Sequence, residues 1–238
     1  MSVFYLKKFA VAQDECAMKV GTDSTILGAW ANAEKADRIL DIGSGTGVLA
    51  LMMAQKNTDA EITAIEIDEA AYLQAKGNFK NSPWSERLQL FHCPVQEFKS
   101  PTLFDVIISN PPFYQSGKHI AAPDEKRRIA RSTETLSFDD LAAAVSALLS
   151  PEGIFYLILP TENETAFVEA AQVEKLYIIK RTLVYPRIGK AANRVLMGFS
   201  KNELTLEQRG ITIRNDSSEA HNYTIEFKEL LRDFMIIF

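Results

Sequence analysis

The feature of this sequence that most restricts its fold is the alternation of short apolar segments with helical patterns. The apolar segments are rich in β-branched residues and occur at 38–42, 61–67, 88–92, 104–109 and 153–159. Helical patterns lie between or after them, at 48–55, 69–81, 137–149 and 162–174. Strands that alternate with helices form a parallel sheet covered on both faces, so the sequence predicts an α/β fold of the Rossmann-like type.

The segment after residue 176 follows a different pattern. Two strand-like runs, 177–185 and 194–200, flank a loop that contains proline and glycine, which is typical of an antiparallel hairpin. A further strand is expected at 207–214 and a helical pattern closes the chain at 223–238. No linker or internal repeat is visible in the sequence. We therefore expect a single domain over 1–238, with an N-terminal extension (1–35), a core (36–200) and a C-terminal strand and helix (201–238).

Charge and cysteine usage exclude several classes of protein. The chain has 26 basic and 31 acidic residues, a formal net charge of −5, which argues against a general nucleic-acid coat protein but leaves a local basic face open. Its longest apolar run, 48–54, is far shorter than the roughly 20 residues of a membrane helix, and the N-terminus does not resemble a secretory signal. Two cysteines and three histidines lack metal-ligand spacing. We expect a cytoplasmic protein with reduced thiols, without a membrane segment or metal.

A glycine-rich turn directly follows the first predicted core strand. Gly43, Gly45 and Gly47 alternate with other residues, and Asp41 precedes the first glycine by two positions. Glycines at a strand-to-helix turn let the backbone approach a ligand closely. The spacing differs from the dinucleotide pattern, in which the last glycine comes one residue later. The acid suits a cationic amino-acid group better than a pyrophosphate, so the loop predicts S-adenosyl-L-methionine as the cofactor.

The second predicted strand ends in a pair of acids about twenty residues beyond the glycine loop. A carboxylate at this position can accept both ribose hydroxyl protons, as it does in dinucleotide folds. We assign this role to Glu66, which directly follows the apolar stretch. Asp68 is more simply interpreted as the start of the next helix, where an acid complements the helix dipole.

A second motif, Asn110-Pro111-Pro112-Phe113, follows the fourth predicted strand. The carboxyl ends of strands are where α/β sheets hold their ligands, and the prolines fix the backbone around Asn110. The Asn110 side-chain oxygen and the Pro111 carbonyl could accept the two protons of an exocyclic amino group, while Phe113 could stack on the attached ring. Such positioning favours methyl transfer to a planar amino nitrogen without a strong base.

Together these motifs resemble the S-adenosylmethionine-dependent methyltransferases that modify amino nitrogens. Four further segments, 16–23, 27–30, 81–84 and 107–113, are similar to the bacterial family of tRNA1(Val) (adenine-37-N6)-methyltransferases, and the resemblance covers nearly the whole chain. It implies a class I methyltransferase fold with a mostly parallel seven-stranded sheet, an antiparallel C-terminal strand and helices on both faces. It also implies a valine tRNA as substrate, modified at adenosine 37 beside the anticodon. No obligate protein partner is evident, and we expect a monomer.

The resemblance also assigns roles to individual residues. The target-base site is expected at Asn110, Pro111, Pro112 and Phe113. The N-terminal extension would contribute to the cofactor site, with Thr22 and Asp23 near the methionine end. In one departure from the family, Gln96 stands where an acid near the cofactor adenine is common. The complete expected cofactor set is Lys19, Gly21, Thr22, Asp23, Asp41, Gly43, Ser44, Gly45, Glu66, Ile67, Gln96 and Asn110.

Two basic stretches are candidates for RNA binding. One lies between the two hairpin strands and contributes Arg187, Lys190 and Arg194, in a run without acidic residues. The other follows the Asn-Pro-Pro-Phe motif and contributes Lys118, Lys126, Arg127, Arg128 and Arg131. Phosphate contacts supply most of the affinity for RNA, and a tRNA loop can splay its bases onto aromatic and guanidinium surfaces. A solvated basic face is the alternative interpretation of both stretches.

Several other functions remain compatible with the motifs. The chemistry would be the same for an N6-adenine methyltransferase acting on another RNA or on DNA. An N5-glutamine methyltransferase of release factors also uses an Asn-Pro-Pro motif, but about 35 residues are too few for its N-terminal helical domain. A cofactor-binding RNA adaptor without activity would have no evident need for the intact motif. A nicotinamide dehydrogenase is disfavoured by the glycine spacing.

Overall fold

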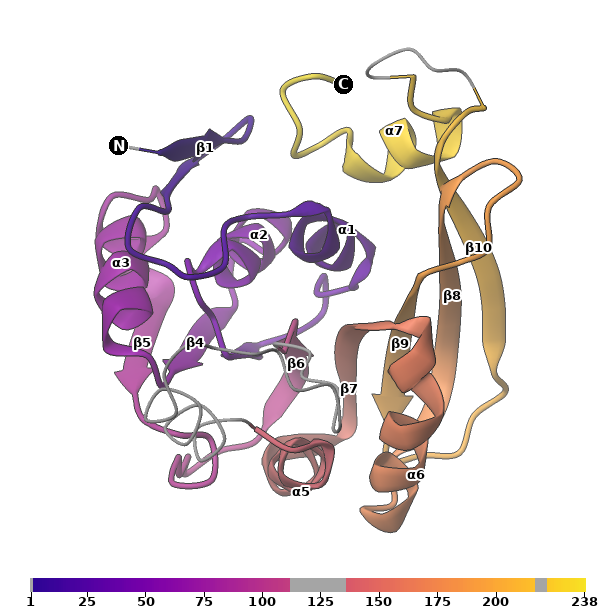
Figure 1. Cartoon of the computed structure of the whole chain (residues 1–238). Helices are drawn as coiled ribbons and strands as arrows, with labels where there is room; N and C mark the ends of the chain where they lie inside the picture. Colours follow the sequence, from indigo (N-terminus) through magenta and orange to yellow (C-terminus); the bar gives the residue numbers. More distant parts are fainter. Residues whose placement is uncertain (1, 112–135, 217–221) are drawn as a thin grey trace, which may run out of the picture.

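The computed structural model describes residues 2–111, 136–216 and 222–238 (Figure 1). Its central feature is an eight-stranded sheet with the strand order β10-β8-β9-β7-β6-β3-β4-β5. These strands are β3 (Arg38–Ile42), β4 (Glu61–Glu66), β5 (Leu88–His92), β6 (Phe104–Ser109), β7 (Leu149–Pro160), β8 (Tyr177–Arg187), β9 (Arg194–Ser200) and β10 (Glu207–Arg214). Within this sheet only β9 runs antiparallel to its neighbours. The mostly parallel α/β fold expected from the sequence is confirmed.

The number of strands in the sheet differs from the expected seven. The extra strand is β10, which pairs in parallel with the outer edge of β8, from Glu207 opposite Lys180 to Arg214 opposite Arg187. The sequence indicates a strand at 207–214, but pairing is a long-range choice that local patterns do not specify. The antiparallel hairpin expected from 177–185 and 194–200 is confirmed by the pairing of β8 with β9.

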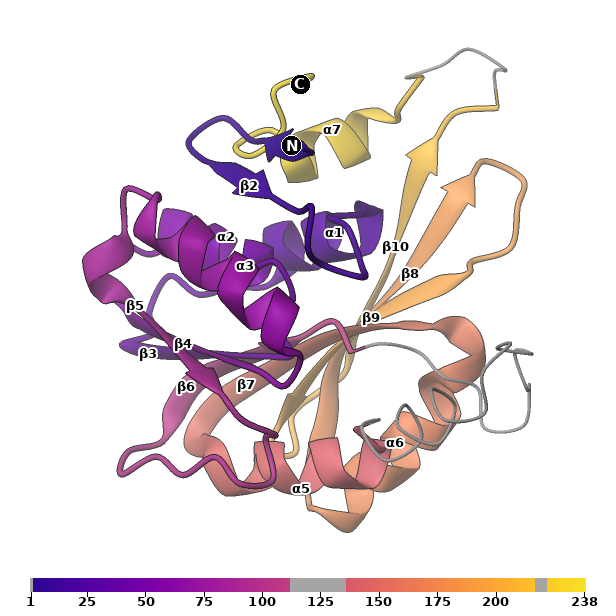
Figure 2. The same ribbon diagram turned by 60° about the vertical axis from the view of Figure 1, so that its left-hand side comes forward.

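Helices cover both faces of the sheet (Figures 1 and 2). One face carries α1 (Thr22–Trp30), α2 (Val48–Lys56) and α3 (Glu69–Lys80), and the other carries α5 (Phe138–Leu148) and α6 (Glu164–Val173). In β3, Ile39 belongs to the core beneath α1 and α2, whereas Leu40 belongs to the core beneath α5 and α6. The continuous apolar strands therefore reflect burial on both faces, as parallel sheets require.

The N-terminal and C-terminal segments meet above the helices α1, α2 and α3, with the N-terminal segment against α3 and the C-terminal helix against α1 (Figures 1 and 2). The N-terminal segment forms a hairpin of β1 (Val3–Tyr5) and β2 (Ala10–Ala12), and near the C-terminus lies α7 (Ile225–Leu231). Leu6 forms a bridge with Met235, and Lys7 donates to the backbone oxygen of Phe238 at 2.7 Å. The helical pattern expected at 223–238 is thus a helix of seven residues followed by turns. No described helix is long and apolar enough to cross a membrane.

The start of α2 requires a glycine. Gly47 precedes the helix with φ at +81°, in the left-handed region that costs other residues roughly 1–2 kcal/mol. A Cβ atom at this position would lie 2.5 Å from the Phe79 ring, which is itself buried. Backbone conformation and packing against α3 therefore both exclude a side chain here.

We predict that Gly47→Ala lowers the free energy of unfolding by about 2 kcal/mol or more, the sum of the left-handed and overpacking costs. Gly77→Ala is the matched control, because Gly77 lies within α3 and a Cβ there meets no atom within 4 Å. That control should raise stability by about 0.5–1 kcal/mol. Urea denaturation measures the free energy of unfolding of both variants. An equal change in the two would contradict the special role of Gly47.

Candidate active site

The candidate site lies where the order of the strands reverses. The chain passes from β3 outward through β4 to β5, then returns to β6 on the other side of β3. In open α/β sheets, ligands bind at the carboxyl ends of the strands at such a switch point. Ile42 and Ser109 are the last paired residues of β3 and β6, and the Ser109 hydroxyl donates to the Ile42 carbonyl at 2.8 Å. The glycine loop and Asn110 therefore leave the sheet side by side.

The glycine loop is hydrogen-bonded to β4 on one side, and its backbone faces open space on the other. The backbone N–H groups of Gly43 and Ser44 donate to the Ile65 carbonyl at 2.9 and 3.0 Å, which ties the loop to β4. Gly43 and Gly45 have φ values of +72° and +54°. A Cβ atom at either position would meet nothing within 4 Å, so the backbone faces open space. This is the geometry of a cradle that a ligand can approach closely.

Glu66 joins the end of β4 to the glycine loop. One carboxylate oxygen, Oε2, accepts from the Gly45 N–H at 2.7 Å, and the other, Oε1, accepts from the N–H groups of Ile67 and Asp68 at 2.9 Å each. The Glu66 side chain is buried and fixed in orientation. Oε2 accepts one bond among the described residues and retains capacity for a ligand hydroxyl.

Asp68 has a different structural role from Glu66. Its carboxylate accepts from the Ala71 N–H at 2.8 Å and caps the start of α3. This is the helix-start role that the sequence indicated for Asp68. The assignment of Glu66 rather than Asp68 to the ribose is thus compatible with the geometry, and it stays a prediction.

Asp41 is fully buried at the base of the loop. Its Oδ2 accepts from the Ala50 N–H of α2 at 3.1 Å, while Oδ1 has no hydrogen-bond partner among the residues that the structure describes. Burial raises the pKa of Asp41 to about 7; the Ala50 hydrogen bond lowers it, and the nearby Glu66 charge adds to the increase. A buried acceptor without a partner is costly, and a cationic ligand at this carboxylate would relieve that cost.

Asn110 presents a second buried acceptor at the same sheet edge. Its Oδ1 has no partner within the described ranges, and the Pro111 residue that follows is buried. Pro112 and Phe113 of the motif lie outside the described residues. The same holds for one of the two predicted RNA-binding sets, Lys118, Lys126, Arg127, Arg128 and Arg131.

The remaining predicted cofactor residues are more dispersed. Lys19, Gly21 and Thr22 are exposed before and at the start of α1. Ile67 is 46% exposed beyond β4, and Gln96 is exposed on the loop after β5. Ser44 is buried in the glycine loop, and its hydroxyl has no partner in the described part of the chain. The geometry therefore brings together Asp41, Ser44, Gly45, Glu66 and Asn110, whereas no hydrogen bond among the described residues joins Gln96 to them.

The second predicted RNA-binding set lies at the carboxyl edge of the sheet. Arg187 ends β8 and Arg194 begins β9, with the exposed Lys190 in the turn between them. Arg194 Nε donates to Asp23 Oδ2 at 2.8 Å. This ion pair joins the start of α1 to the basic turn, so a residue expected near the cofactor contacts one expected to bind RNA.

Sequence reasoning missed Asn78, which clamps the glycine loop to the N-terminal hairpin. Its side-chain amide donates to the carbonyls of Thr46 and Ala12 at 2.9 Å each, and its oxygen accepts from the Ala12 N–H at 2.9 Å. The available signal was the Gly77-Asn78 pair, since two weak helix formers stand together inside a predicted helix.

These residues fit S-adenosyl-L-methionine. The open glycine backbone leaves room for a ligand, the unpartnered Asp41 oxygen suits a cationic amino group, and Glu66 has an acceptor available for a ribose hydroxyl. No group of three His, Cys, Asp or Glu side chains within the described residues could hold a metal ion.

Comparison with known proteins agrees with this geometry. Residues 16–140 match the family model described as "Methyltransferase small domain". A solved structure, a predicted O-methyltransferase from Agrobacterium tumefaciens, superimposes with a TM-score of 0.69 at 19% identity, over 89% of this chain and 96% of that chain. This likeness establishes the fold, which together with the glycine loop is that of a class I methyltransferase, the class that uses S-adenosyl-L-methionine.

Two curated relatives narrow the class. A tRNA1(Val) (adenine(37)-N6)-methyltransferase from Dyadobacter fermentans is 42% identical over 99% of this chain and 98% of its own length. A protein of the same name from Bacteroides thetaiotaomicron is 40% identical over 98% of this chain and 97% of its own length. The chain belongs to the family of the tRNA1(Val) (adenine(37)-N6)-methyltransferases.

The buried Asp41 predicts an unusual dependence of stability on pH. Its pKa is about 7 in the folded protein against an ordinary value of 3.8, so between these values the folded state holds a proton that the unfolded state has released. Rising pH therefore favours unfolding, by at most about 4 kcal/mol from this group at 1.36 kcal/mol per pKa unit. The stabilising contribution is complete below the unfolded pKa and is lost as the pH rises to about 7.

We expect Asp41→Asn to flatten this dependence in the cofactor-free protein. Urea denaturation between about pH 4.5 and pH 7.5 measures it, with the exposed Asp37→Asn as a control of the same chemistry. The wild type and the control should lose stability in parallel across this range, while Asp41→Asn loses less. Parallel curves for all three proteins would show that the raised pKa of Asp41 does not cause the pH dependence of stability.

Proposed function

We propose that this protein transfers a methyl group from S-adenosyl-L-methionine to N6 of adenine in tRNA, at adenosine 37 of tRNA1(Val), in the cytoplasm. The observation that carries this proposal is the buried Asn110 oxygen without a described partner, directly beyond the strand that neighbours the glycine loop. An acceptor in that position suits the proton of an amino group. The names of the family's curated relatives support tRNA as the substrate and adenine N6 as the target.

Each residue of the site has a specific part in the proposal. Asp41 binds the cationic amino group of the cofactor, the Gly43–Gly45 backbone cradles it, and Glu66 accepts from its ribose. The cofactor supplies a methyl group on a positively charged sulfur that an amine can attack directly. Burial around Asp41 and Glu66 strengthens these interactions because the surroundings have a low dielectric constant.

Asn110 and Pro111 position the nitrogen that is methylated. The N6 lone pair of adenine is delocalised into the ring, so the free amine is a poor nucleophile. Two fixed carbonyl acceptors, the Asn110 side chain and the Pro111 backbone, hold the two N6 protons and direct the lone pair toward the methyl group. A nitrogen–carbon bond forms, the sulfur–carbon bond breaks, and the nitrogen releases one proton to solvent.

The adenine must leave its stack to reach this edge of the sheet. Extrusion of a base costs a few kcal/mol and is easiest from a loop, which favours an anticodon-loop nucleotide over a paired one. Arg187 and Lys190 lie at the carboxyl edge of the same sheet, where they can contact the phosphates on either side of the extruded base.

The first experiment tests the chemistry with Asn110→Ala. Purified protein is incubated with methyl-labelled S-adenosyl-L-methionine and unmodified valine tRNA transcript, and the digested nucleosides are analysed by mass spectrometry. We expect N6-methyladenosine from the wild type and a rate reduced by about 10²- to 10³-fold in Asn110→Ala, with cofactor binding retained. Asn32→Ala, an exposed asparagine at the far end of α1, is the matched control and should keep full activity.

Each rival function has its own result in this experiment. Labelled glutamine in a release factor, without label in tRNA, would contradict tRNA as the substrate but agree with S-adenosyl-L-methionine as the cofactor. Label in ribosomal RNA or DNA alone would show that another nucleic acid is the substrate. Retention of cellular function by Asn110→Ala without methyl transfer would favour an RNA adaptor.

A second experiment tests by charge reversal whether Arg187 and Lys190, at the carboxyl edge of the sheet, bind RNA. We predict that Arg187→Glu with Lys190→Glu weakens tRNA binding and lowers the salt slope by about 0.7–0.9 for each phosphate contact that is lost. The control pair is Lys35→Glu with Lys99→Glu, two exposed lysines that precede β3 and β6 rather than follow a strand. Filter binding over a salt series measures the salt dependence of tRNA affinity for both double variants. Equal slopes for the two would show that Arg187 and Lys190 do not contact the RNA.

A further inference from the structure

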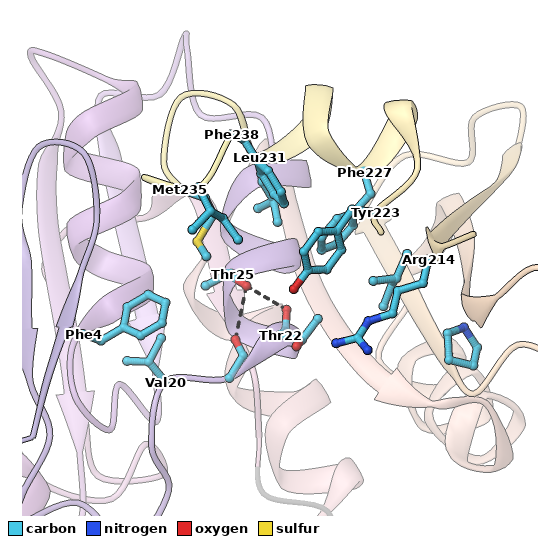
Figure 3. Close-up of a pocket in the computed structure, with 14 residues that line it drawn as sticks. Phe4, Val20, Thr22, Thr25, Arg214, Tyr223, Phe227, Leu231, Met235 and Phe238 are labelled. Atoms are coloured by element: carbon cyan, nitrogen blue, oxygen red, sulfur yellow. Dashed lines mark hydrogen bonds between the residues drawn. The ribbon is translucent and has the colours of Figure 1, made fainter. Parts of the chain in front are cut away.

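A pocket of about 340 Å³ lies between the N-terminal hairpin, the start of α1, the end of β10 and the C-terminal segment (Figure 3). Thr22 lies at its floor, Phe4 and Val20 on one side, and Tyr223 on the opposite side, and Gly21 also lines it. The volume is at the lower end of the range of about 300–1,000 Å³ for small-molecule sites, so it suits a single ring system. Gly21 and Thr22 also belong to the cofactor set expected from the sequence, whereas the roles proposed above for Asp41, Glu66 and Asn110 do not account for this pocket.

The lining is largely apolar and aromatic, with the hydroxyl groups of Thr22, Thr25 and Tyr223, and the Arg214 guanidinium points into the pocket (Figure 3). Arg214 lies 5.5 Å from the centre of the Tyr223 ring, within the range of a cation–π contact. Tyr223 in turn stacks on Phe227 at 5.3 Å, with the rings 22° apart. The ring pair therefore supports the guanidinium at the pocket, and among the described residues no hydrogen bond or ion pair engages its N–H donors.

The register of the sheet places this pocket on the same edge as the candidate active site. Arg214 is the last residue of β10 and pairs with Arg187, the last residue of β8. Both strands run parallel to β3 and β6, so their carboxyl ends face the same way as the glycine loop and Asn110. The Asp23–Arg194 ion pair lies at the start of α1, directly beyond the Thr22 floor. The pocket is thus flanked by the basic residues Arg187, Lys190 and Arg214.

The charge and the chemistry of the lining residues indicate which ligand fits the pocket. Of the described residues that line the pocket, none is acidic, and the cation at its mouth suits a phosphate. RNA loops are recognised by splaying bases into aromatic and apolar sites and onto arginine planes, while phosphates contact arginine. A largely aromatic and apolar pocket with hydroxyl groups and one guanidinium in its lining therefore matches one nucleotide with its phosphate.

We propose that this pocket is a second nucleotide site, which holds a base of the same RNA close to the methylated adenine and binds its phosphate through Arg214. This inference rests on the proposed tRNA substrate. Two splayed bases on one sheet edge would fix the register of the loop, so that the adenine to be methylated reaches Asn110. Tyr223 acts as a positioning residue, because its ring both bounds the pocket and supports Arg214.

The test uses the full chain with valine tRNA transcript and two pairs of variants. Tyr223→Leu removes the ring and Tyr223→Phe keeps it, while Arg214→Gln removes the cation and Lys228→Gln removes the same charge from α7 outside the pocket lining. We expect Tyr223→Leu to raise the KM for RNA by about tenfold, within the roughly 5- to 150-fold that loss of a base-stacking contact produces. Arg214→Gln should also lower the salt slope of RNA binding by about one phosphate contact.

The readouts separate this proposal from the proposed function. In the expected result, kcat at saturating RNA and the KM for S-adenosyl-L-methionine stay at wild-type values, and Tyr223→Phe and Lys228→Gln behave as wild type. The thermal unfolding midpoint is measured as well, because the Tyr223 ring packs on Phe227 and Phe238, and all assays are run below the midpoint of the least stable variant. If the wild type methylates tRNA and both Tyr223→Leu and Arg214→Gln have an unchanged KM and salt slope, the nucleotide site is overturned alone. If the wild type neither binds nor methylates tRNA, the proposed function fails and the nucleotide site fails with it.

Discussion

The parallel pairing of β3 with β6 is the constraint on which the rest of the molecule depends. It joins two strands far apart in the sequence, Arg38–Ile42 and Phe104–Ser109, and brings the loops that follow them to one edge. The Ser109 hydroxyl closes the junction on the Ile42 carbonyl. Without this pairing, the glycine loop and Asn110 would be separate local motifs, and neither could form a site alone.

A small set of polar side chains then fixes the junction. Glu66 joins the end of β4 to Gly45, Asn78 joins α3 and the N-terminal hairpin to Thr46, and Asp41 accepts from the start of α2. These side chains are buried, so each unmade hydrogen bond would carry a large desolvation cost. The exceptions are Asp41 Oδ1 and Asn110 Oδ1, which have no partner among the described residues and lie where a ligand is expected.

The carboxyl edge extends this site toward the outer strands. Antiparallel β9 reverses direction between β7 and β8, so its first residue, Arg194, lies at the same edge as the last residues of its neighbours. The addition of β10 places Arg214 beside Arg187 and creates room for a pocket beneath α7. A basic border on one side of an otherwise acidic protein can orient RNA electrostatically.

The sequence by itself determined the α/β class, most strand positions, the glycine loop and the Asn-Pro-Pro-Phe motif, because apolar periodicity and turn chemistry are local properties. It also indicated the helix-start role of Asp68, which caps α3 in the structure, while the ribose role of Glu66 stays a prediction. Only the tertiary structure decided the eighth strand, the Asn78 clamp, the Asp23–Arg194 ion pair and the pocket at Tyr223. Each of these joins segments far apart in the chain, and their pairing depends on packing and burial that no local pattern encodes.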